Sequence, residues 1–109
     1  MILDFEQMEP KVLEHFYGGE QALHARMFID ENNRILRGRL EPGASIGMHT
    51  HDAGSEIIYV LSGRGTVLYD EGNEAVRAGQ CHYCPKGHSH SLVNDGDQPL
   101  EFVAVVPRQ

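Results

Sequence analysis

Residues 43–63 read GASIGMHTHDAGSEIIYVLSG, and this stretch decides the fold predicted for the rest of the chain. It sets His49 and His51 two residues apart, and Glu56 follows at the start of a run of apolar residues. Because alternate residues of a strand share a face, both imidazoles are expected to point the same way. A turn over residues 52–55 would bring the Glu56 carboxylate beside them. The stretch therefore predicts β structure and three ligands of a metal site that needs a fourth.

Outward from this stretch, strand patterns alternate with turns rich in Gly, Asn, Asp and Pro. Two strands flanking the turn 31–33 form a predicted hairpin, because asparagine tolerates the positive φ of a tight turn. Together with the strands around residues 43–63, about nine or ten short strands and no convincing helix indicate an all-β sandwich or barrel. The strands with predicted bounds are 22–30, 34–41, 56–61, 64–69, 74–76, 80–84, 89–93 and 100–106.

Apolar residues on the expected strands give a candidate core. In the strand 34–41, Ile35, Arg37 and Arg39 share one face, and Leu36, Gly38 and Leu40 share the other. The predicted core residues are Leu36, Leu40, Ile58, Val60, Leu92, Phe102 and Val105.

Residues 1–20 carry scattered apolar side chains with neither helical nor strand spacing, and Gly18 and Gly19 interrupt whatever precedes them. We expect an N-terminal arm over 1–20 that packs on the domain or on a second subunit. The remainder, 21–109, is long enough for one barrel domain with a modest core.

Composition excludes several classes of protein. The chain has 109 residues, 40% hydrophobic and 23% charged, which is typical of a globular domain. A net charge of −7 with histidine neutral leaves no basic surface for nucleic acid or an anionic membrane. No apolar run is long enough to span a bilayer, and the acidic N-terminus lacks the features of a signal peptide. These features predict a cytoplasmic protein.

Cys81 and Cys84 form a C-x-x-C pattern, which occurs in redox motifs and in halves of zinc sites. The redox motif opens a helix, whereas this segment reads as a strand that ends at Pro85. Two residues three apart in a strand face opposite sides, and no second cysteine pair exists to complete a four-sulfur site. We predict free thiols, buried or half-buried.

A second histidine cluster supplies the missing ligand candidate. Residues 79–94 read GQCHYCPKGHSHSLVN, and His90 starts a strand just after the turn marked by Pro85 and Gly87. His90 is therefore predicted to be the fourth ligand, joined to the first three when the two segments lie side by side.

The two segments together resemble the two sequence motifs of the cupin superfamily. The first is Gly43, five residues, His49, one residue, His51, four residues, Glu56, six residues and Gly63. A spacer of 15 residues separates it from the second motif. That motif is Gly79, five residues, Pro85, one residue, Gly87, two residues, His90, three residues and Asn94. The chain is similar to a small single-domain cupin of the conserved-barrel type, and no ligand position departs from the pattern.

The resemblance implies a double-stranded β-helix (jelly-roll) barrel, often dimeric, with His49, His51, Glu56 and His90 as ligands of a six-coordinate metal. Two positions would remain for water or substrate. Three imidazoles and a carboxylate suit Mn, Fe, Co, Ni, Cu or Zn, and the sequence does not choose among them. We expect one divalent metal per chain and a homodimer, in which the N-terminal arm adds a strand to the neighbouring sheet.

Two functions follow from this reading. The first is a metalloenzyme acting on a small oxygen-rich molecule, such as a carboxylate, sugar or catechol, by isomerisation, dioxygenation or decarboxylation. The second is a non-catalytic sensor or binding module with a metal-anchored pocket. Five further residues are candidates for that pocket. The arginines would bind a carboxylate or phosphate if their face is inward, and the others would wall the pocket or stand at its rim. They are Arg37, Arg39, Met48, Tyr59 and His88.

Overall fold

The computed structural model describes all 109 residues and contains ten strands and two short 3-10 helices. In chain order the elements are η1 (Phe5–Gln7), β1 (Lys11–Glu14), η2 (Phe16–Gly18), β2 (Ala22–Ile29), β3 (Asn33–Leu40), β4 (Ser45–Thr50), β5 (Glu56–Ser62), β6 (Arg64–Tyr69), β7 (Glu74–Arg77), β8 (Cys81–Cys84), β9 (Ser89–Val93) and β10 (Leu100–Pro107).

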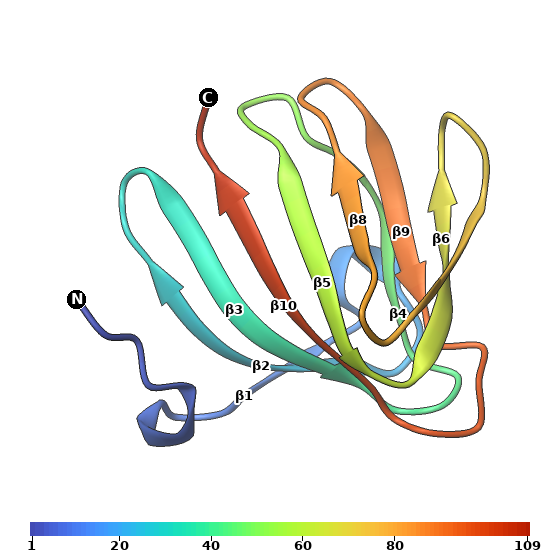
Figure 1. The fold of residues 1–109 in the computed structure, drawn as a ribbon, viewed down its shortest axis with the longest axis horizontal. Coiled ribbons are helices and arrows are strands. Elements are labelled where there is room, and N and C mark those ends of the chain that lie inside the picture. The colour runs from blue at the N-terminus through green and yellow to red at the C-terminus, as the bar shows by residue number, and fades with distance from the viewer.

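The strands form two antiparallel sheets that together make a jelly-roll β-barrel. The larger sheet has the order β1-β2-β3-β10-β5-β8, and the smaller has the order β4-β9-β6-β7. Figure 1 shows β3, β10 and β5 side by side, with β10 between two strands that come much earlier in the sequence. The predicted all-β barrel is confirmed.

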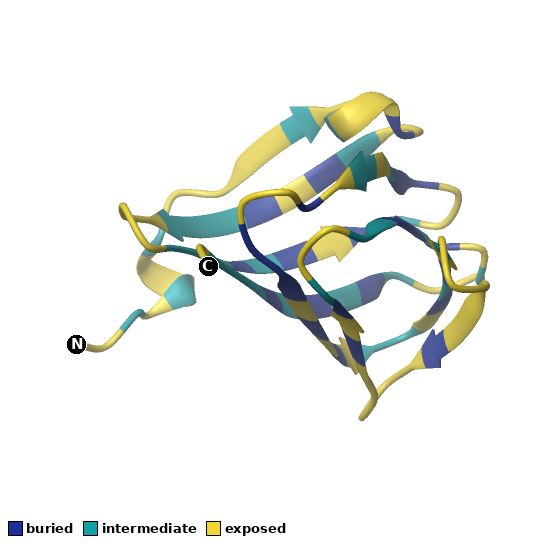
Figure 2. Cartoon of the chain, turned by 90° about the horizontal axis from the view of Figure 1, so that it is seen from above, coloured by how far each residue is buried: buried dark blue, intermediate teal, exposed yellow.

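The core lies between the two sheets. Buried and exposed residues alternate along the strands, as Figure 2 shows, because successive side chains of a strand point to opposite faces. Phe102 of β10 is fully buried, and it lies opposite Gly38 of β3. A side chain at position 38 would run into the Phe102 ring, so glycine there makes room for the largest buried residue of the core.

The N-terminal residues pack on the same chain. β1 pairs with β2 and forms an edge of the larger sheet. η2 lies on β4, where side chains at Gly19 and Gly47 would collide with the backbone of the facing segment. The two glycines therefore allow a close approach that carries Tyr17 onto the strand holding His49. Exchange of the arm with a second subunit stays a prediction.

The eight strands with predicted bounds are all present, with ends within one residue of those expected. β1 was not predicted, because an edge strand of four residues has no apolar alternation to mark it. Six of the seven predicted core residues are buried. The prediction for Val105 was wrong: Phe102 and Ala104 face inward, so Val105 lies half-buried on the outer face of β10.

No helix in the structure has the length and apolar character that a membrane crossing requires. A cytoplasmic location stays a prediction.

Candidate metal centre

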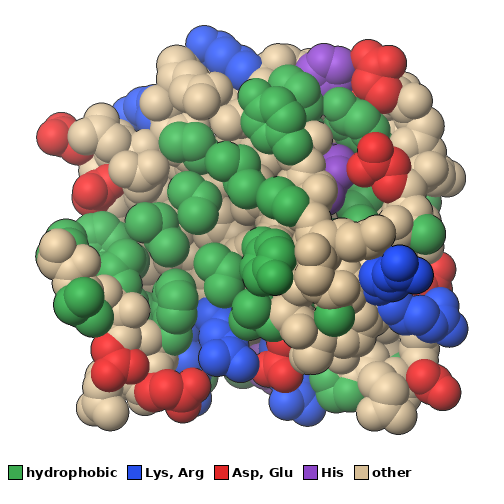
Figure 3. All heavy atoms as spheres, in the orientation of Figure 1, with side chains coloured by type: hydrophobic (Ala, Val, Ile, Leu, Met, Phe, Trp, Pro, Cys, Tyr) green, Lys and Arg blue, Asp and Glu red, His purple; other side chains and the backbone are tan.

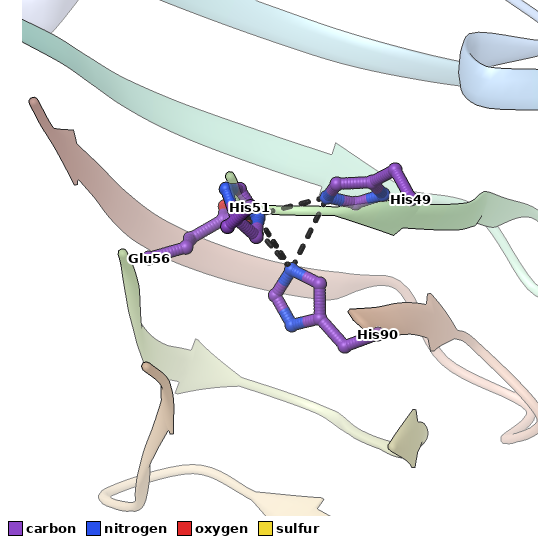
Figure 4. A group of neighbouring side chains, drawn as sticks. All are labelled: His49, His51, Glu56 and His90. Carbon is purple, nitrogen blue, oxygen red and sulfur yellow. Dashed lines mark hydrogen bonds and ion pairs between the residues drawn. The ribbon is translucent and has the colours of Figure 1, made fainter. Parts of the chain in front are cut away.

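Four side chains from the two motifs converge at one point inside the barrel. His49 comes from β4, His51 from the residue after it, Glu56 from the start of β5, and His90 from β9. Nε2 of His90 lies 2.9 Å from Oε1 of Glu56, 3.0 Å from Nε2 of His51 and 3.2 Å from Nε2 of His49 (Figure 4). Oε1 of Glu56 is also 2.9 Å from Nε2 of His51 and 3.5 Å from Nε2 of His49. Four potential donor atoms therefore surround a single position.

The pairing of β4 with β9 explains how two distant motifs meet. His49 stands directly opposite His90, so their side chains leave the same face of neighbouring strands. The loops beyond are tied together, because the His51 amide donates to the His88 carbonyl at 3.0 Å and the Gly87 amide donates to the His51 carbonyl. Gly87 has φ +92°, a conformation that favours glycine and turns the chain back into β9.

The cluster is shielded from solvent. The exposed fractions of the side chains are 10% for His49, 8% for His51, 7% for Glu56 and 2% for His90. Burial alone would raise the pKa of Glu56, but the close contacts of its carboxylate with the ring nitrogens of the three histidines outweigh burial and hold that pKa well below its usual value. Burial lowers the pKa of His90, against the opposite effect of the neighbouring carboxylate. An anionic carboxylate beside a neutral imidazole is the ionisation state that metal binding requires.

The donor set fits a divalent transition metal. Nδ1 of His49 is 2.8 Å from the Gly47 carbonyl oxygen, which can only accept, so this nitrogen carries the proton and Nε2 presents its lone pair to the cluster. Imidazole nitrogens with one carboxylate oxygen suit Mn, Fe, Co, Ni, Cu or Zn. The four predicted ligands are thus brought together, and a metal bound among them is our proposal.

The two arginines nominated from the sequence lie outside the barrel. Arg37 is 3.6 Å from Glu101 and 3.7 Å from Glu6, and Nε of Arg39 donates to Glu41 at 2.8 Å. Both face away from the metal cluster because Leu36, Gly38 and Leu40 take the inward positions of β3.

The other three nominated residues also lie away from the four ligands. Met48 and Tyr59 are exposed, since their neighbours along each strand occupy the inward positions. His88 stands at the rim, where its Nδ1 lies 2.9 Å from Oδ1 of Asp70. None of the three contacts the cluster through its side chain.

The cysteines are free thiols on opposite faces of β8, as predicted. Cys84 is buried, and burial together with the nearby Glu56 carboxylate raises its pKa to about 11. Cys81 is exposed rather than buried or half-buried, because odd-numbered positions of β8 face outward.

Three residues that sequence reasoning missed lie around the cluster. The Tyr17 ring stacks on His49 with centroids 4.2 Å apart, and Nε2 of His82 lies 3.0 Å from Nδ1 of His90. Arg34 shares the inward face of β3, and its Nε is buried without a hydrogen-bond partner. Strand alternation was a usable signal for two of them. Arg34 lies on the same face of its strand as Leu36, and His82 lies on the same face as Cys84. Tyr17 had no such signal.

A cavity of about 420 Å³ opens beside the cluster. Tyr17, Arg34 and His51 contribute to its wall, together with the turn between β2 and β3 and the end of β10. A much smaller space deeper in the barrel joins Arg34 to His49 and Glu56. A small molecule entering this cavity would therefore meet His51 of the candidate metal centre and the unpaired guanidinium of Arg34.

Comparison with known proteins agrees with the geometry. Residues 36–106 match the cupin domain family. The chain belongs to the cupin family. One relative, the oxalate-binding protein of Thermotoga maritima, is 32% identical over 97% of this chain and 93% of its own length.

Solved structures show the same barrel in other proteins. A predicted oxalate decarboxylase from Thermotoga maritima superimposes on this cupin with a TM-score of 0.92 and 28% identity, covering the whole of both chains. The polyketide cyclase RemF from Streptomyces resistomycificus gives a TM-score of 0.81 at 22% identity, over 100% of this chain and 80% of its own. At that identity the second likeness concerns the fold alone.

Proposed function

We propose that the chain binds a small carboxylate, with oxalate as the first candidate, through one divalent transition metal held by His49, His51, Glu56 and His90. The convergence of four shielded donor atoms, with one of the four residues, His51, lining a cavity, carries the proposal. The Thermotoga maritima relative, similar along nearly the whole chain, is named for oxalate binding. Four protein ligands leave two positions of a six-coordinate metal for two oxygens of one ligand.

A bound metal would supply a Lewis acid that polarises ligand oxygens. The chain's own residues would shield the ligating histidine and attract the ligand. Tyr17 covers one face of His49, limiting its movement and the access of water. Arg34 places a positive charge on the approach to the cluster, and the Arg34 guanidinium carbon is held 5.9 Å from the centroid of the Phe16 ring.

Arg34 favours an anion over a neutral sugar. No carboxylate pairs with its guanidinium within the chain, and its buried Nε lacks an acceptor, which is costly unless a ligand supplies one. The cavity wall also carries three carboxylates, those of Asp30, Glu31 and Asp52, and the guanidinium of Arg108; the Asp30 carboxylate already accepts hydrogen bonds from the backbone of the turn. A carboxylate oxygen is the acceptor that a guanidinium pairs with best.

Replacing Arg34 with glutamine is expected to weaken oxalate binding by about 10–100-fold, because a hydrogen bond to a charged group is worth about 1.5–3 kcal/mol. Isothermal titration of the Mn²⁺-loaded protein with oxalate measures the change. Arg37→Gln is the matched control, since it removes the same charge from the outer face of the same strand. Equal affinities for both variants at equal metal content would contradict the role of Arg34.

The same preparation separates a binding module from an enzyme. Oxalate bound and recovered unchanged identifies a binding module, whereas release of formate and CO₂, or uptake of O₂ with oxalate present, identifies a metalloenzyme. Failure of oxalate and of other small carboxylates to bind the loaded protein, or tighter binding of a sugar or catechol, would refute the proposed ligand class.

We also propose that the chain forms a homodimer through the outer face of the larger sheet. One apolar row crosses five strands, because cross-strand pairing aligns its members. Figure 3 shows hydrophobic side chains gathered over this face. A second copy suits the row, since a twofold axis would lay it against itself and bury an apolar surface that monomers rarely leave open. The row consists of Tyr83, Ile57, Val105, Ile35 and Phe28.

The variant Ile57→Glu is expected to convert the dimer to a monomer, because a carboxylate would be buried at the centre of the interface. Light scattering after size-exclusion chromatography measures the mass. Leu68→Glu is the control: its side chain lies on the smaller sheet with a similar exposed fraction, 36% against 38% for Ile57. A monomeric wild type would refute the dimer.

A further inference from the structure

His82 lies behind His90, at the edge of the ring opposite the metal cluster. Nε2 of His82 is 3.0 Å from Nδ1 of His90, and Nδ1 of His82 is 2.8 Å from Oε1 of Glu74. The His82 side chain is 1% exposed, whereas that of Glu74 is 48% exposed. Three side chains from β9, β8 and β7 therefore connect the buried cluster with the protein surface.

The direction of these hydrogen bonds follows from the ring nitrogen that faces the metal cluster. Nε2 of His90 points at the other three ligands, so in a neutral ring that binds metal the proton is on Nδ1. That proton is donated to Nε2 of His82, which must then carry its own proton on Nδ1. The second proton is donated to the Glu74 carboxylate, which can only accept. Every polar atom in the series has one consistent role.

We propose that His82 and Glu74 are positioning residues that fix the tautomer and ring orientation of His90 and thereby set the metal affinity of the centre. Partners of this kind orient ligating histidines and make them stronger donors. The series also joins the two sheets, since β8 belongs to the larger sheet and β7 and β9 to the smaller. The inference rests on the metal centre but not on the identity of the carboxylate ligand.

A competing arrangement uses the same residues differently. His82, Cys84 and His90 are themselves close enough to hold an ion, with ligand atoms within 4.8 Å of one another. In that arrangement Nε2 of His82 would bind metal and could not accept the His90 proton. A distance of 3.0 Å between two ring nitrogens suits either arrangement. We favour the hydrogen bond because Nε2 of His90 faces the other three ligands, so that Nδ1 of the neutral ring keeps its proton and needs an acceptor.

The test is Co²⁺ titration of metal-free protein, followed by visible absorption. His82→Leu is expected to weaken Co²⁺ binding by about 10–100-fold, and Glu74→Ala by about 10-fold. His82→Gln is expected to restore most of the affinity lost in His82→Leu, because an amide oxygen can accept the Nδ1 proton. Glu71→Ala, which removes a nearby exposed carboxylate that does not contact His82, is expected to leave the affinity unchanged.

A second measurement reports the tautomer directly. Long-range ¹H–¹⁵N spectra of the Zn²⁺-loaded protein are expected to show the His82 proton on Nδ1. A proton on Nε2, or a thiolate charge-transfer band from Cys84 in the Co²⁺ spectrum, would overturn the proposal. Co²⁺ affinities of His82→Leu and Glu74→Ala equal to that of wild type would also overturn the proposal. If His82→Leu does not fold, the Co²⁺ affinity of Glu74→Ala compared with that of Glu71→Ala decides. If the wild-type protein binds no Co²⁺, the metal centre itself is refuted. If it binds Co²⁺ but not oxalate, only the proposed ligand is refuted and this inference stands.

Discussion

Protein in which both His49 and His90 are replaced by alanine is expected to retain no divalent metal after purification, whereas wild type retains one ion per chain. The two residues face each other across β4 and β9, and their loss leaves only His51 and Glu56. Two remaining ligands cannot hold a metal that normally takes at least four. Elemental analysis of protein prepared without chelator or nickel resin measures the content.

Thermal unfolding gives an independent measure of the same site. Metal at about 100 times its Kd stabilises a folded protein by about 2.7 kcal/mol, so wild type should unfold at a higher temperature when metal is added and the double variant should not. His88→Ala is the control, because His88 stands at the rim and contacts Asp70 instead of the cluster. Metal content equal in wild type and the double variant would refute the assigned ligands.

Phe102→Ala is expected to lower the free energy of unfolding by about 3–5 kcal/mol, the cost of removing a large aromatic from a packed core. Phe102 is fully buried at the centre of the larger sheet, with Gly38 leaving the space that its ring fills. Since total stabilities are about 5–15 kcal/mol, this one change removes a large part of the stability. Urea unfolding followed by circular dichroism measures it.

Val103→Ala supplies the comparison on the same strand. Val103 is half-buried on the outer face of β10, so its truncation should cost about 1 kcal/mol. A loss for Phe102→Ala no larger than that for Val103→Ala would show that the barrel interior does not depend on this ring.

The features predictable from sequence were those with a local cause. Turn residues bounded the strands, and the spacing of the two motifs identified His49, His51, Glu56 and His90 before any contact between them was visible. Such spacings carry information because a strand has a fixed period and a glycine such as Gly87 adopts a φ that other residues avoid.

The features that were not predictable depend on how separate segments pack. Strand parity puts Arg34 on the face of Leu36, but only the packing of the strands shows that its guanidinium reaches the cavity beside His51. Tyr17 reaches His49 only because two glycines let η2 lie on β4. His82 gained its partner from β9, eight residues further along the chain. No local pattern encodes such pairings.

The position of β10 between β3 and β5 has a consequence for how the chain folds during its synthesis on the ribosome. The other nine strands are synthesised first, yet β3 and β5 have no contact across the middle of their sheet until residues 100–107 arrive. A nascent chain that already contains all four ligands therefore still lacks the centre of the larger sheet. We expect barrel closure to be a late, slow event dominated by pairings distant in sequence, with exposed strand edges that need protection until then.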